Sequence, residues 1–542
     1  MNKNTLLNKI FSFLQVKKTL WGGLIMLFLS FPIFAQSAAE KPKLIVGIMI
    51  DGLQQEHINA FWNNFGTKSI KMIVEEGTSL NQVRYNIVSS GNASDVATVM
   101  TGTTPSYHGV AGNQYFNRKQ KSEESILFDA NQVGIGTSSR YSAHKLLAST
   151  ILDELMLSNS GRSKTYAVGI DPETTIMLGG HTAKSVAWID DVFLKWVTTG
   201  YYSDGLSSYA DEMNMNGTFS NIVGIKWQPM LPADSYVWNY KSFEHRPSAR
   251  IKEDMSQAIL RNTPAANTLV TELAMNLIKG ERLGKNLHTD MLMLQYTVRA
   301  PNGHSSAVKS IEKEDIYLRL DKEIKRLLER INWETGLENT LVFVFSNISG
   351  AHTPIELGNN KIPAGYFNAN RSVALLNTYL MALYGQERWV EGYFGKNIFL
   401  DRRKIEEKKL NLREMRQVVA DFMLEFEGVR STYTIEQVLN QPFSTDRDAV
   451  NIRNSYHKNS GGDVVISLLP GWLEVDNEQK PIGETNSTNS EVPVYFYGWK
   501  IPKQKVNKVY NITDIAPTLS YLLDIPFPNA CIGSPIEELK PF

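Results

Sequence analysis

The sequence predicts an α/β fold with a mainly parallel central sheet and helices on both faces. One observation is a set of continuous apolar runs, which is the pattern of strands buried on both faces of a sheet. These runs cover residues 44–50, 164–170, 290–294 and 340–345. The other observation is that segments with helical spacing, such as 142–159 and 311–331, alternate with the runs. Strands that alternate with helices are typical of βαβ units and a parallel sheet.

Composition narrows the class of protein. The chain has 542 residues, of which 42% are hydrophobic, and equal numbers of acidic and basic residues. A net charge of zero gives no overall attraction to nucleic acid or to an anionic membrane, so nucleic acid is not expected as a partner. Cys531 is the only cysteine, which excludes an internal disulfide and a cysteine-based metal site.

The N-terminus has the three parts of a secretory signal. Four lysines lie within the first eighteen residues, an apolar block covers 20–34, and small residues follow at 35–39. We therefore expect residues 1–39 to be a signal peptide and 40–542 to be the mature protein, periplasmic or secreted, without a stable membrane span. The alternative is an uncleaved anchor, although the apolar block is short for a span of about 20 residues.

Residues 187–247 differ from their surroundings. Tryptophan and tyrosine are frequent here and helical periodicity fades. We expect a lobe inserted over the sheet within one large domain, and the simplest interpretation is that its aromatic side chains only pack the lobe. Further along, Asn411 with Glu414 resembles a capping box, which predicts a helix that ends near Gly428.

The segment 44–115 organises the rest of the chain. Its first apolar run ends at Asp51, and a carboxylate at the C-terminal end of such a strand lies where open α/β sheets bind ligands. Residues 89–109 read as a turn that leads into a helix, whose free N–H groups favour an anion. Together, a metal-binding carboxylate and an anion-binding helix start would make a phosphate site.

Eight segments together resemble the alkaline phosphatase superfamily, in particular its secreted phosphate-monoesterase branch with a threonine nucleophile and a type I phosphodiesterase/nucleotide pyrophosphatase-like fold. They occur in the family's order and span the mature chain. They are residues 45–52 (IVGIMIDG), 101–109 (TGTTPSYHG), 112–113 (GN), 180–183 (GHTA), 317–321 (YLRLD), 361–367 (KIPAGYF), 470–472 (PGW) and 512–519 (ITDIAPTL).

The resemblance implies two zinc ions, which activate the nucleophile and steady the leaving oxygen. Six carboxylate and imidazole ligands hold them. The first ligand is present as Asp51. The nucleophile lies ten residues before Gly102, and that position is Asn92. An amide cannot become the alkoxide that attacks phosphorus, so covalent catalysis at this position is not expected.

Most of the other implied ligands are substituted. His304 matches a histidine of the second metal site, but its aspartate partner is Ala300. The adjacent Asp-His pair that serves both metals is replaced by Asn347 and Ile348, and the last histidine by Glu491. Two of six ligands therefore remain, whereas zinc sites usually need three or four.

The two side chains that the resemblance implies for binding the phosphate group are substituted as well. The resemblance implies a lysine and an arginine where this chain has Asp171 and Glu173, which would repel a phosphoryl dianion. The simplest interpretation of the two carboxylates is a solvated loop, and the alternative is a site for a cation or a basic partner. Asn113, which in the family binds a phosphate oxygen, is retained and could instead hold a turn. In the same way, Asp51 could only cap a helix and His304 could lie on the surface.

These substitutions lead to the prediction of a secreted, catalytically inactive protein that binds an unknown protein or small-molecule ligand and needs no metal cofactor. The alternative is a metal-dependent phosphomonoesterase or phosphodiesterase with a rebuilt active site. In that case Ser90 or Ser94 would be the nucleophile. Zinc would then be bound by new ligands, for which the candidates are Asp51, Asp95, His304 and Glu491.

Overall fold

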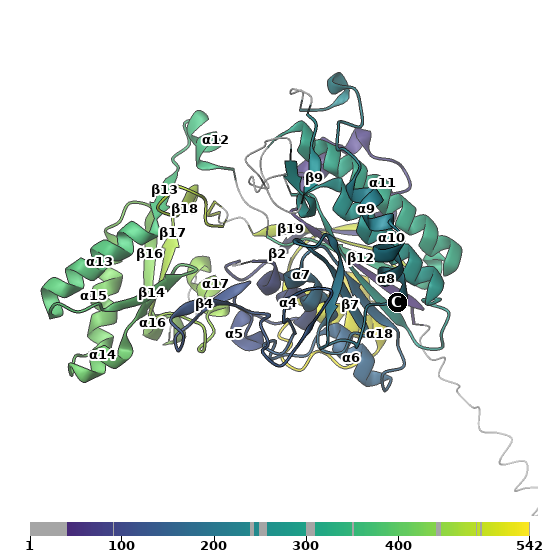
Figure 1. Cartoon of the computed structure of the whole chain (residues 1–542). Helices are drawn as coiled ribbons and strands as arrows, with labels where there is room; N and C mark the ends of the chain where they lie inside the picture. The colour runs from purple at the N-terminus through teal and green to yellow at the C-terminus, as the bar shows by residue number, and fades with distance from the viewer. Residues whose placement is uncertain are drawn as a thin grey trace, which may run out of the picture. The chain divides into compact units, whose positions relative to one another are not determined.

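The computed structural model describes residues 41–540 except 90, 239–242, 249–256, 300–308, 349–351, 441–445, 484 and 488–489. The predicted signal and the site candidates Ser90, Ala300 and His304 lie outside the described residues. At the centre is a ten-stranded sheet in the order β20-β2-β19-β12-β1-β11-β6-β7-β8-β5 (Figure 1). Its strands are β1 (Leu44–Asp51), β2 (Thr78–Arg84), β5 (Gly134–Ile135), β6 (Thr165–Val168), β7 (Ser185–Asp190), β8 (Lys195–Thr199), β11 (Asp290–Thr297), β12 (Thr340–Phe345), β19 (Glu491–Gly498) and β20 (Gln504–Asn511).

The middle of the sheet is parallel. β1 runs parallel to β11 on one side and to β12 on the other. Beyond β11, β6 is parallel to β11 and β7 is parallel to β6. β19 is antiparallel to both of its neighbours, β12 and β2. The predicted α/β class with a mainly parallel sheet is therefore confirmed. The parallel part of the sheet includes β1, the first strand of the organising segment 44–115.

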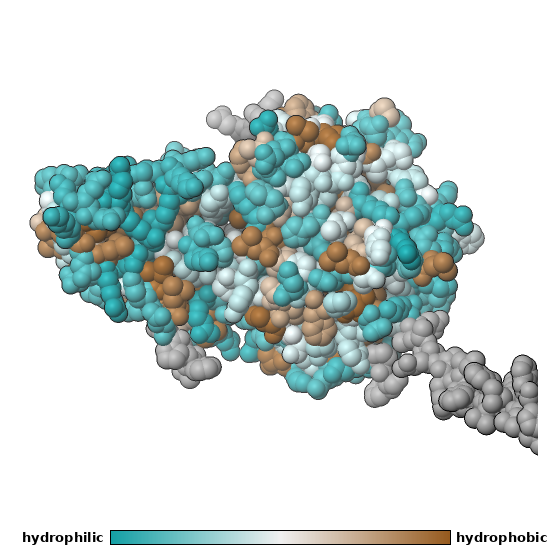
Figure 2. Space-filling view, turned by 90° about the horizontal axis from the view of Figure 1, so that it is seen from below, coloured by the Kyte–Doolittle hydropathy of each residue, from teal (hydrophilic) through white to brown (hydrophobic). Residues whose placement is uncertain are grey.

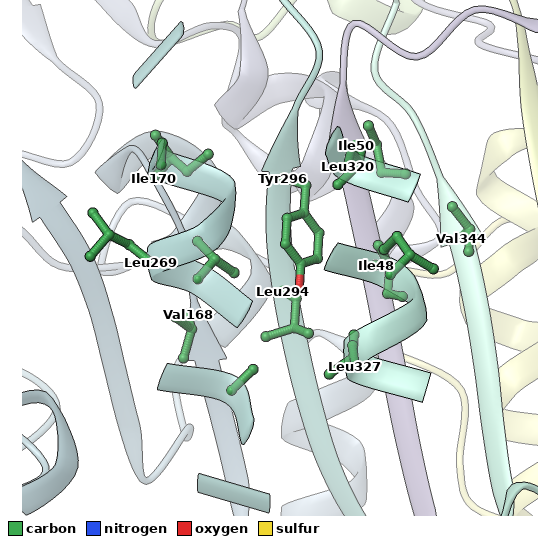
Figure 3. Close-up of a cluster of buried hydrophobic side chains, with 14 of the residues drawn as sticks. Ile48, Ile50, Val168, Ile170, Leu269, Leu294, Tyr296, Leu320, Leu327 and Val344 are labelled. Carbon is green, nitrogen blue, oxygen red and sulfur yellow. The ribbon is translucent and has the colours of Figure 1, made fainter. Parts of the chain in front are cut away.

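Helices cover both faces of the sheet. Side chains of β1 alternate between the two resulting cores, with Ile48 and Ile50 in one and Ile45 and Met49 in the other. Figure 3 shows the first core, where Leu320 and Leu327 of a long helix lie over Ile48, Ile50 and Val344. That core is made with α2 (Gln55–Ala60), α3 (Ile70–Glu76), α10 (Pro264–Gly280) and α11 (Ile311–Glu334), and the other with α4 (Asn92–Thr101), α6 (Ile151–Ser158), α7 (Pro172–Gly179) and α18 (Ile515–Leu523).

The aromatic segment packs against α11. Asp315, which is fully buried, accepts hydrogen bonds from Trp227 Nε1 at 2.7 Å and from the Tyr236 hydroxyl at 2.5 Å. The adjacent Glu314 accepts from the backbone N–H groups of Val237 and Trp238. Two neighbouring carboxylates on one helix thus hold the segment. Part of the predicted lobe, however, lies in the main sheet as β7 and β8, and the division at 187–247 stays a prediction.

A second α/β module, which sequence reasoning did not predict, follows in the chain (green in Figure 1). Its four-stranded sheet has the order β14-β15-β17-β16, and its own core contains Leu376, Trp389 and Val419. Its elements are β14 (Val390–Phe394), β15 (Asn397–Leu400), β16 (Val429–Thr434), β17 (Val464–Leu468), α13 (Ala369–Tyr384), α14 (Arg402–Glu407), α15 (Leu412–Leu424), α16 (Ile435–Asn440) and α17 (Arg447–Ser455), with the pair β13 (Gly365–Asn368) and β18 (Trp472–Val475) beside them.

Three arginines surround one carboxylate in this module. Asp463, which is fully buried, contacts Arg402 and Arg416 within the module at 2.8 and 2.7 Å. It also pairs at 2.7 Å with Arg118, which lies between β3 (Gln114–Asn117) and β4 (Ser122–Ser125). The Phe116 ring of β3 packs on Phe399 of β15. The β3–β4 hairpin therefore connects the organising segment of the chain to the second module.

The face shown in Figure 2 has hydrophobic residues in separate patches, with hydrophilic residues between them. Some of the exposed apolar side chains lie along α13, including Leu375 and Leu383. Among the residues that the structure describes, no helix is both long enough and apolar enough to cross a membrane.

Candidate active site

The candidate site lies where three neighbouring parallel strands end. β1 ends at Asp51, which pairs in register with Thr297 at the end of β11. β12 ends at Phe345 and is followed by Asn347. Because parallel strands end at one edge of a sheet, Asp51, Asn347 and Arg299, the second residue after β11, meet at this edge. Ligands bind at such edges in open α/β sheets.

Asp51 is buried, and its carboxylate is contacted by three N–H donors. Asn347 Nδ2 donates to Oδ1 at 2.7 Å, and Asn92 Nδ2 donates to Oδ2 at 3.2 Å. Arg299 Nε donates to Oδ2 at 2.8 Å and completes an ion pair. Burial alone would raise the pKa of Asp51, but the charge of Arg299 and these hydrogen bonds hold it below its ordinary value. Asp51 is therefore an ionised carboxylate at neutral pH.

The two asparagines form a closed set of hydrogen bonds around Asp51. Asn347 Nδ2 also donates to Asn92 Oδ1 at 2.8 Å, and Asn347 Oδ1 accepts from Gly52 N at 2.9 Å. Asn92 is the first residue of α4, so it ties the start of that helix to the ends of β1 and β12. The position implied for the nucleophile thus carries an amide with hydrogen-bond partners on both its oxygen and its nitrogen.

Asn113 holds the start of α4 from the other side. Its Oδ1 accepts from Ala93 N at 2.9 Å, which satisfies one of the free N–H groups at the helix N-terminus. A Cβ at Gly91 would lie 2.5 Å from Asn113 Oδ1, and Gly91 has a φ of 128°. Only glycine fits this approach, so the GN motif at 112–113 and the turn before α4 are structurally coupled.

A second carboxyl group, Asp95, lies on the first turn of α4. Its Oδ2 accepts from the Ser89 hydroxyl at 2.9 Å and from Ile348 N at 3.1 Å. Burial is the main cause that raises its pKa to about 7, and the charge of Asp51 raises it further while Arg299 lowers it. Asp95 therefore takes up and releases a proton near neutral pH, with a hydroxyl beside it.

The serine candidates from the sequence differ in access. Ser94 is fully buried, and within the described part of the chain its hydroxyl has no hydrogen-bond partner. It therefore cannot reach a substrate at the surface. Ser89, which sequence reasoning did not single out, is only half-buried and has a carboxylate acceptor in Asp95.

Asp171 and Glu173 lie at the end of the neighbouring strand β6. Asp171 is buried and caps α7, because its Oδ1 accepts from Thr174 N at 2.8 Å. Its other oxygen is contacted by the Gln295 side-chain amide. Burial, followed by the charge of Asp171, raises the pKa of Glu173 to about 7. Asp171 is thus a helix cap in this structure.

Glu491 begins β19 and lies opposite Arg84 of β2, with which it forms an ion pair at 2.7 Å. Both side chains are about a third exposed, at 38% and 29%. Ile348, at the other substituted position, packs against the core beneath α4.

The described residues do not fit the pair of zinc ions that the resemblance implies. Within the described ranges, no three histidine, cysteine or acidic side chains converge as a metal cage would require. Asp51 faces N–H donors, which repel a cation, and Asn347 turns its nitrogen toward it. Of the implied ligands, Ala300 and His304 belong to the segment outside the described residues.

Comparison with known proteins decides the family. The model of the family "type I phosphodiesterase / nucleotide pyrophosphatase" matches residues 45–493, which is most of the chain. The chain belongs to this family. This family consists of phosphoric ester hydrolases, which is the coarse class of the protein.

Three relatives extend along nearly the whole chain. The chain is 27% identical over 522 residues to the alkaline phosphatase PafA of Elizabethkingia meningoseptica, which covers 93% of this chain and 95% of that protein. It is 27% identical to the alkaline phosphatase PhoV of Synechococcus elongatus, with 94% of each covered, and to a protein of Myroides odoratus named as a calcium-transporting ATPase, with 94% and 97% covered. The crystal structure of PafA matches with a TM-score of 0.84 at 26% identity, over 93% of this chain and 99% of that one.

These comparisons correct two predictions. The prediction of an inactive binding or scaffold protein is wrong, because relatives over more than nine-tenths of the chain are named as alkaline phosphatases. The prediction that no metal cofactor is needed is wrong for the same reason, since alkaline phosphatases are the group for which the resemblance implies zinc. The predicted alternative, a phosphoric ester hydrolase with a rebuilt site, fits these relatives better than the inactive protein does.

Two site residues were missed, Arg299 and Ser89. Each had a signal in the sequence. Arg299 follows a buried strand by two residues, at the edge where Asp51 needs a counter-charge. Ser89 lies two residues before Gly91, which precedes α4, and six residues before the acidic side chain of Asp95 on the helix's first turn.

Proposed function

We propose that this protein hydrolyses phosphoric monoesters at the edge of the sheet that carries Asp51. The observation that supports it most is the similarity to named alkaline phosphatases over more than 90% of both chains. The fold adds support, because the edge combines a helix N-terminus with a guanidinium group. Both favour an anion, and a phosphoryl group is the anion on which the family acts.

In this proposal the phosphoryl group binds at the start of α4. The positive end of the helix dipole points toward it, and Arg299 places a guanidinium group at this edge, paired with Asp51. Asn92 and Asn347 keep the helix start and the strand ends in one arrangement, so the anion meets a preformed site. A site of this kind needs little rearrangement when charge develops in the transition state.

Ser89 is the proposed nucleophile and Asp95 its base. The hydroxyl donates to the carboxylate at 2.9 Å, and a pKa of about 7 suits a group that accepts a proton at neutral pH. Attack would form a bond between Ser89 Oγ and phosphorus and break the bond to the leaving oxygen, and the serine proton would pass through Asp95 to that oxygen, which departs as an alcohol. Asp95 would then take a proton from a water molecule that attacks the phosphoserine, and would return it to Ser89 Oγ as phosphate is released. The Asn92 amide then has a positioning role.

Asp51 is the implied zinc ligand that the described residues retain, and by themselves these residues do not fit zinc. A direct test is to purify the mature protein, measure its metal content by mass spectrometry and follow hydrolysis of 4-nitrophenyl phosphate with and without added zinc. We expect turnover of the monoester. Absence of turnover at every pH and zinc concentration tested would overturn the proposal.

A second candidate function is hydrolysis of phosphoric diesters, which Asp171 and Glu173 favour. The resemblance implies two cations at these positions, but this chain has two carboxylates. Negative charge there disfavours binding of a phosphoric monoester, which is a dianion, more than binding of a diester, which carries a single negative charge. The ratio of rates on bis(4-nitrophenyl) phosphate and 4-nitrophenyl phosphate separates the two candidates. A ratio well above one supports the diesterase.

We also propose that the protein acts outside the cytoplasm after removal of residues 1–39. The lysine-rich start and the short apolar block support this. The mass of the protein recovered from a periplasmic or culture fraction tests it, and we expect an N-terminus between Gln36 and Glu40. An N-terminus at Met1 would support the uncleaved anchor instead.

A further inference from the structure

The backbone just before Ser89 is held by the second module. Val88 N donates a hydrogen bond to Ser455 Oγ on α17 at 2.7 Å. The preceding residue on that helix, Asn454, donates through Nδ2 to Asn86 O at 2.8 Å. Among the described residues, α17 supplies all of the hydrogen bonds that reach the three residues before Ser89. Two neighbouring side chains on one helix therefore hold the segment that leads to this serine.

The Val88 side chain adds an apolar contact to these hydrogen bonds. It packs against a small core of the second module that contains Ala449 and Ile452 of α17, both of which are buried. Because Val88 is bonded directly to Ser89, a shift of Val88 away from this core would move the Ser89 hydroxyl. That hydroxyl donates to Asp95 Oδ2 at 2.9 Å, so such a shift would lengthen the hydrogen bond.

The second module reaches the start of α4 by another path as well. Asn113, which accepts from Ala93 N at that helix start, directly precedes the β3–β4 hairpin. The hairpin is held to the module by the ion pair of Arg118 with Asp463 at 2.7 Å. Two segments beside the start of α4, one before the helix in the chain and one after it, are thus anchored in the same module.

We propose that Asn454 and Ser455 are positioning residues for the reaction, because they hold Ser89 with its hydroxyl toward Asp95. The inference rests on the proposed function, in which Ser89 attacks phosphorus. A misplacement of about 1 Å in the attacking oxygen can cost about 100-fold in rate. Binding of the phosphoryl group is assigned to the helix start and Arg299, which these two side chains do not contact. Their removal should therefore lower kcat and leave KM nearly unchanged.

The experiment compares Ser455→Ala with the unchanged mature protein in the hydrolysis of 4-nitrophenyl phosphate. The variant loses the acceptor for Val88 N, and we expect kcat to fall about tenfold with KM within about twofold. Ser455→Thr keeps a hydroxyl at the same position and should return kcat to within about twofold of the unchanged protein. Ser431→Ala is the matched control, because this serine of β16 lies in the same module and its hydroxyl contacts Asp448 instead. It should match the unchanged protein.

Hydrogen–deuterium exchange tests the contact without a substrate. The Val88 amide should exchange faster in Ser455→Ala than in the unchanged protein, because its N–H loses its acceptor, and should keep its rate in Ser431→Ala. If Ser455→Ala does not fold, Asn454→Ala serves in its place with the same expected loss of kcat. Unchanged kcat in the folded variant would overturn this inference alone, as would a loss of kcat that Ser455→Thr does not restore. If the unchanged protein shows no hydrolysis, the proposed function fails and this inference with it, even where the exchange result shows that α17 holds the segment.

Discussion

Asn347 Nδ2 donates a hydrogen bond to Asp51 Oδ1 across 2.7 Å, and this contact joins the ends of two central strands. Both residues are almost fully buried. Asn347→Ala should lower the free energy of unfolding by about 1–3 kcal/mol, because it leaves one buried carboxylate oxygen and the Asn92 amide without this partner. Urea denaturation measures the change. Asn360→Ala, at an exposed amide, is the control and should have little effect.

The raised pKa of Asp95 predicts that the stability of the protein falls as pH rises. Its pKa in the folded protein, about 7, lies above the ordinary value of 3.8, so the folded state retains a proton that the unfolded chain releases. Its contribution is therefore fully present below about pH 4 and is lost up to about pH 7, by at most about 4 kcal/mol. Asp95→Asn should remove this dependence and stabilise the protein at pH 8 but not at pH 4.

The measurement is chemical denaturation between pH 4 and 8. Asp211→Asn, at an exposed position on α8 (Ser208–Met215), is the matched control and should leave the pH dependence of the unchanged protein. An identical slope in the Asp95 and Asp211 variants would contradict the assignment of the proton to Asp95.

The hydrogen bond from Ser89 to Asp95 predicts that the proposed reaction passes through a phosphoserine. Ser89→Ala should reduce kcat for 4-nitrophenyl phosphate by about 100-fold or more, because it removes the attacking oxygen and the group that hands its proton to Asp95. Mass spectrometry of the protein quenched during turnover should detect a phosphoserine at position 89. Ser220→Ala, at an exposed serine of the α9 helix (Thr218–Val223), should keep full activity. Turnover by Ser89→Ala at the normal rate would point to attack by water.

Elements with a continuous apolar pattern could be predicted from the sequence. Element boundaries that depend on local capping were predicted less well. Residues 44–50 predicted a buried strand, and β1 covers 44–51 with every residue buried. Residues 142–159 predicted one helix, but α6 begins only after Thr150, whose side chain accepts from Asp153 N in a capping box. The leucines at 146 and 147 continue the helical spacing, but they lie in the loop before the cap, and Leu147 is exposed.

The site was predictable in position but not in chemistry. The carboxylate at the end of the first strand and the helix start at Asn92 do meet, since Asn92 Nδ2 lies 3.2 Å from Asp51 Oδ2. The partner that neutralises Asp51 could not be read from spacing, because Arg299 is 248 residues away and only the parallel pairing of β1 with β11 brings it there. The sheet of the second module was not predicted, because β14, β15 and β17 are strands of only four or five residues and give a weak pattern. Its helix α15 was predicted, because it follows the capping signal at Asn411.

The ion pairs of Asp463 with three arginines are predicted to stabilise the second module. Burial would raise its pKa, but the charges of Arg118 and Arg402 hold it below the ordinary value, so the carboxylate contributes stability above about pH 4 and loses it as pH falls through the lowered pKa. Asp463→Asn should lower the free energy of unfolding at pH 7 by about 3–5 kcal/mol, because it leaves the surrounding guanidinium groups without a counter-charge. Urea denaturation at pH 7 and pH 3 tests both parts, and the difference from the unchanged protein should shrink at pH 3. Asp421→Asn, exposed on α15 of the same module, is the control and should match the unchanged protein at both pH values, whereas an equal loss in the two variants would contradict the role of Asp463.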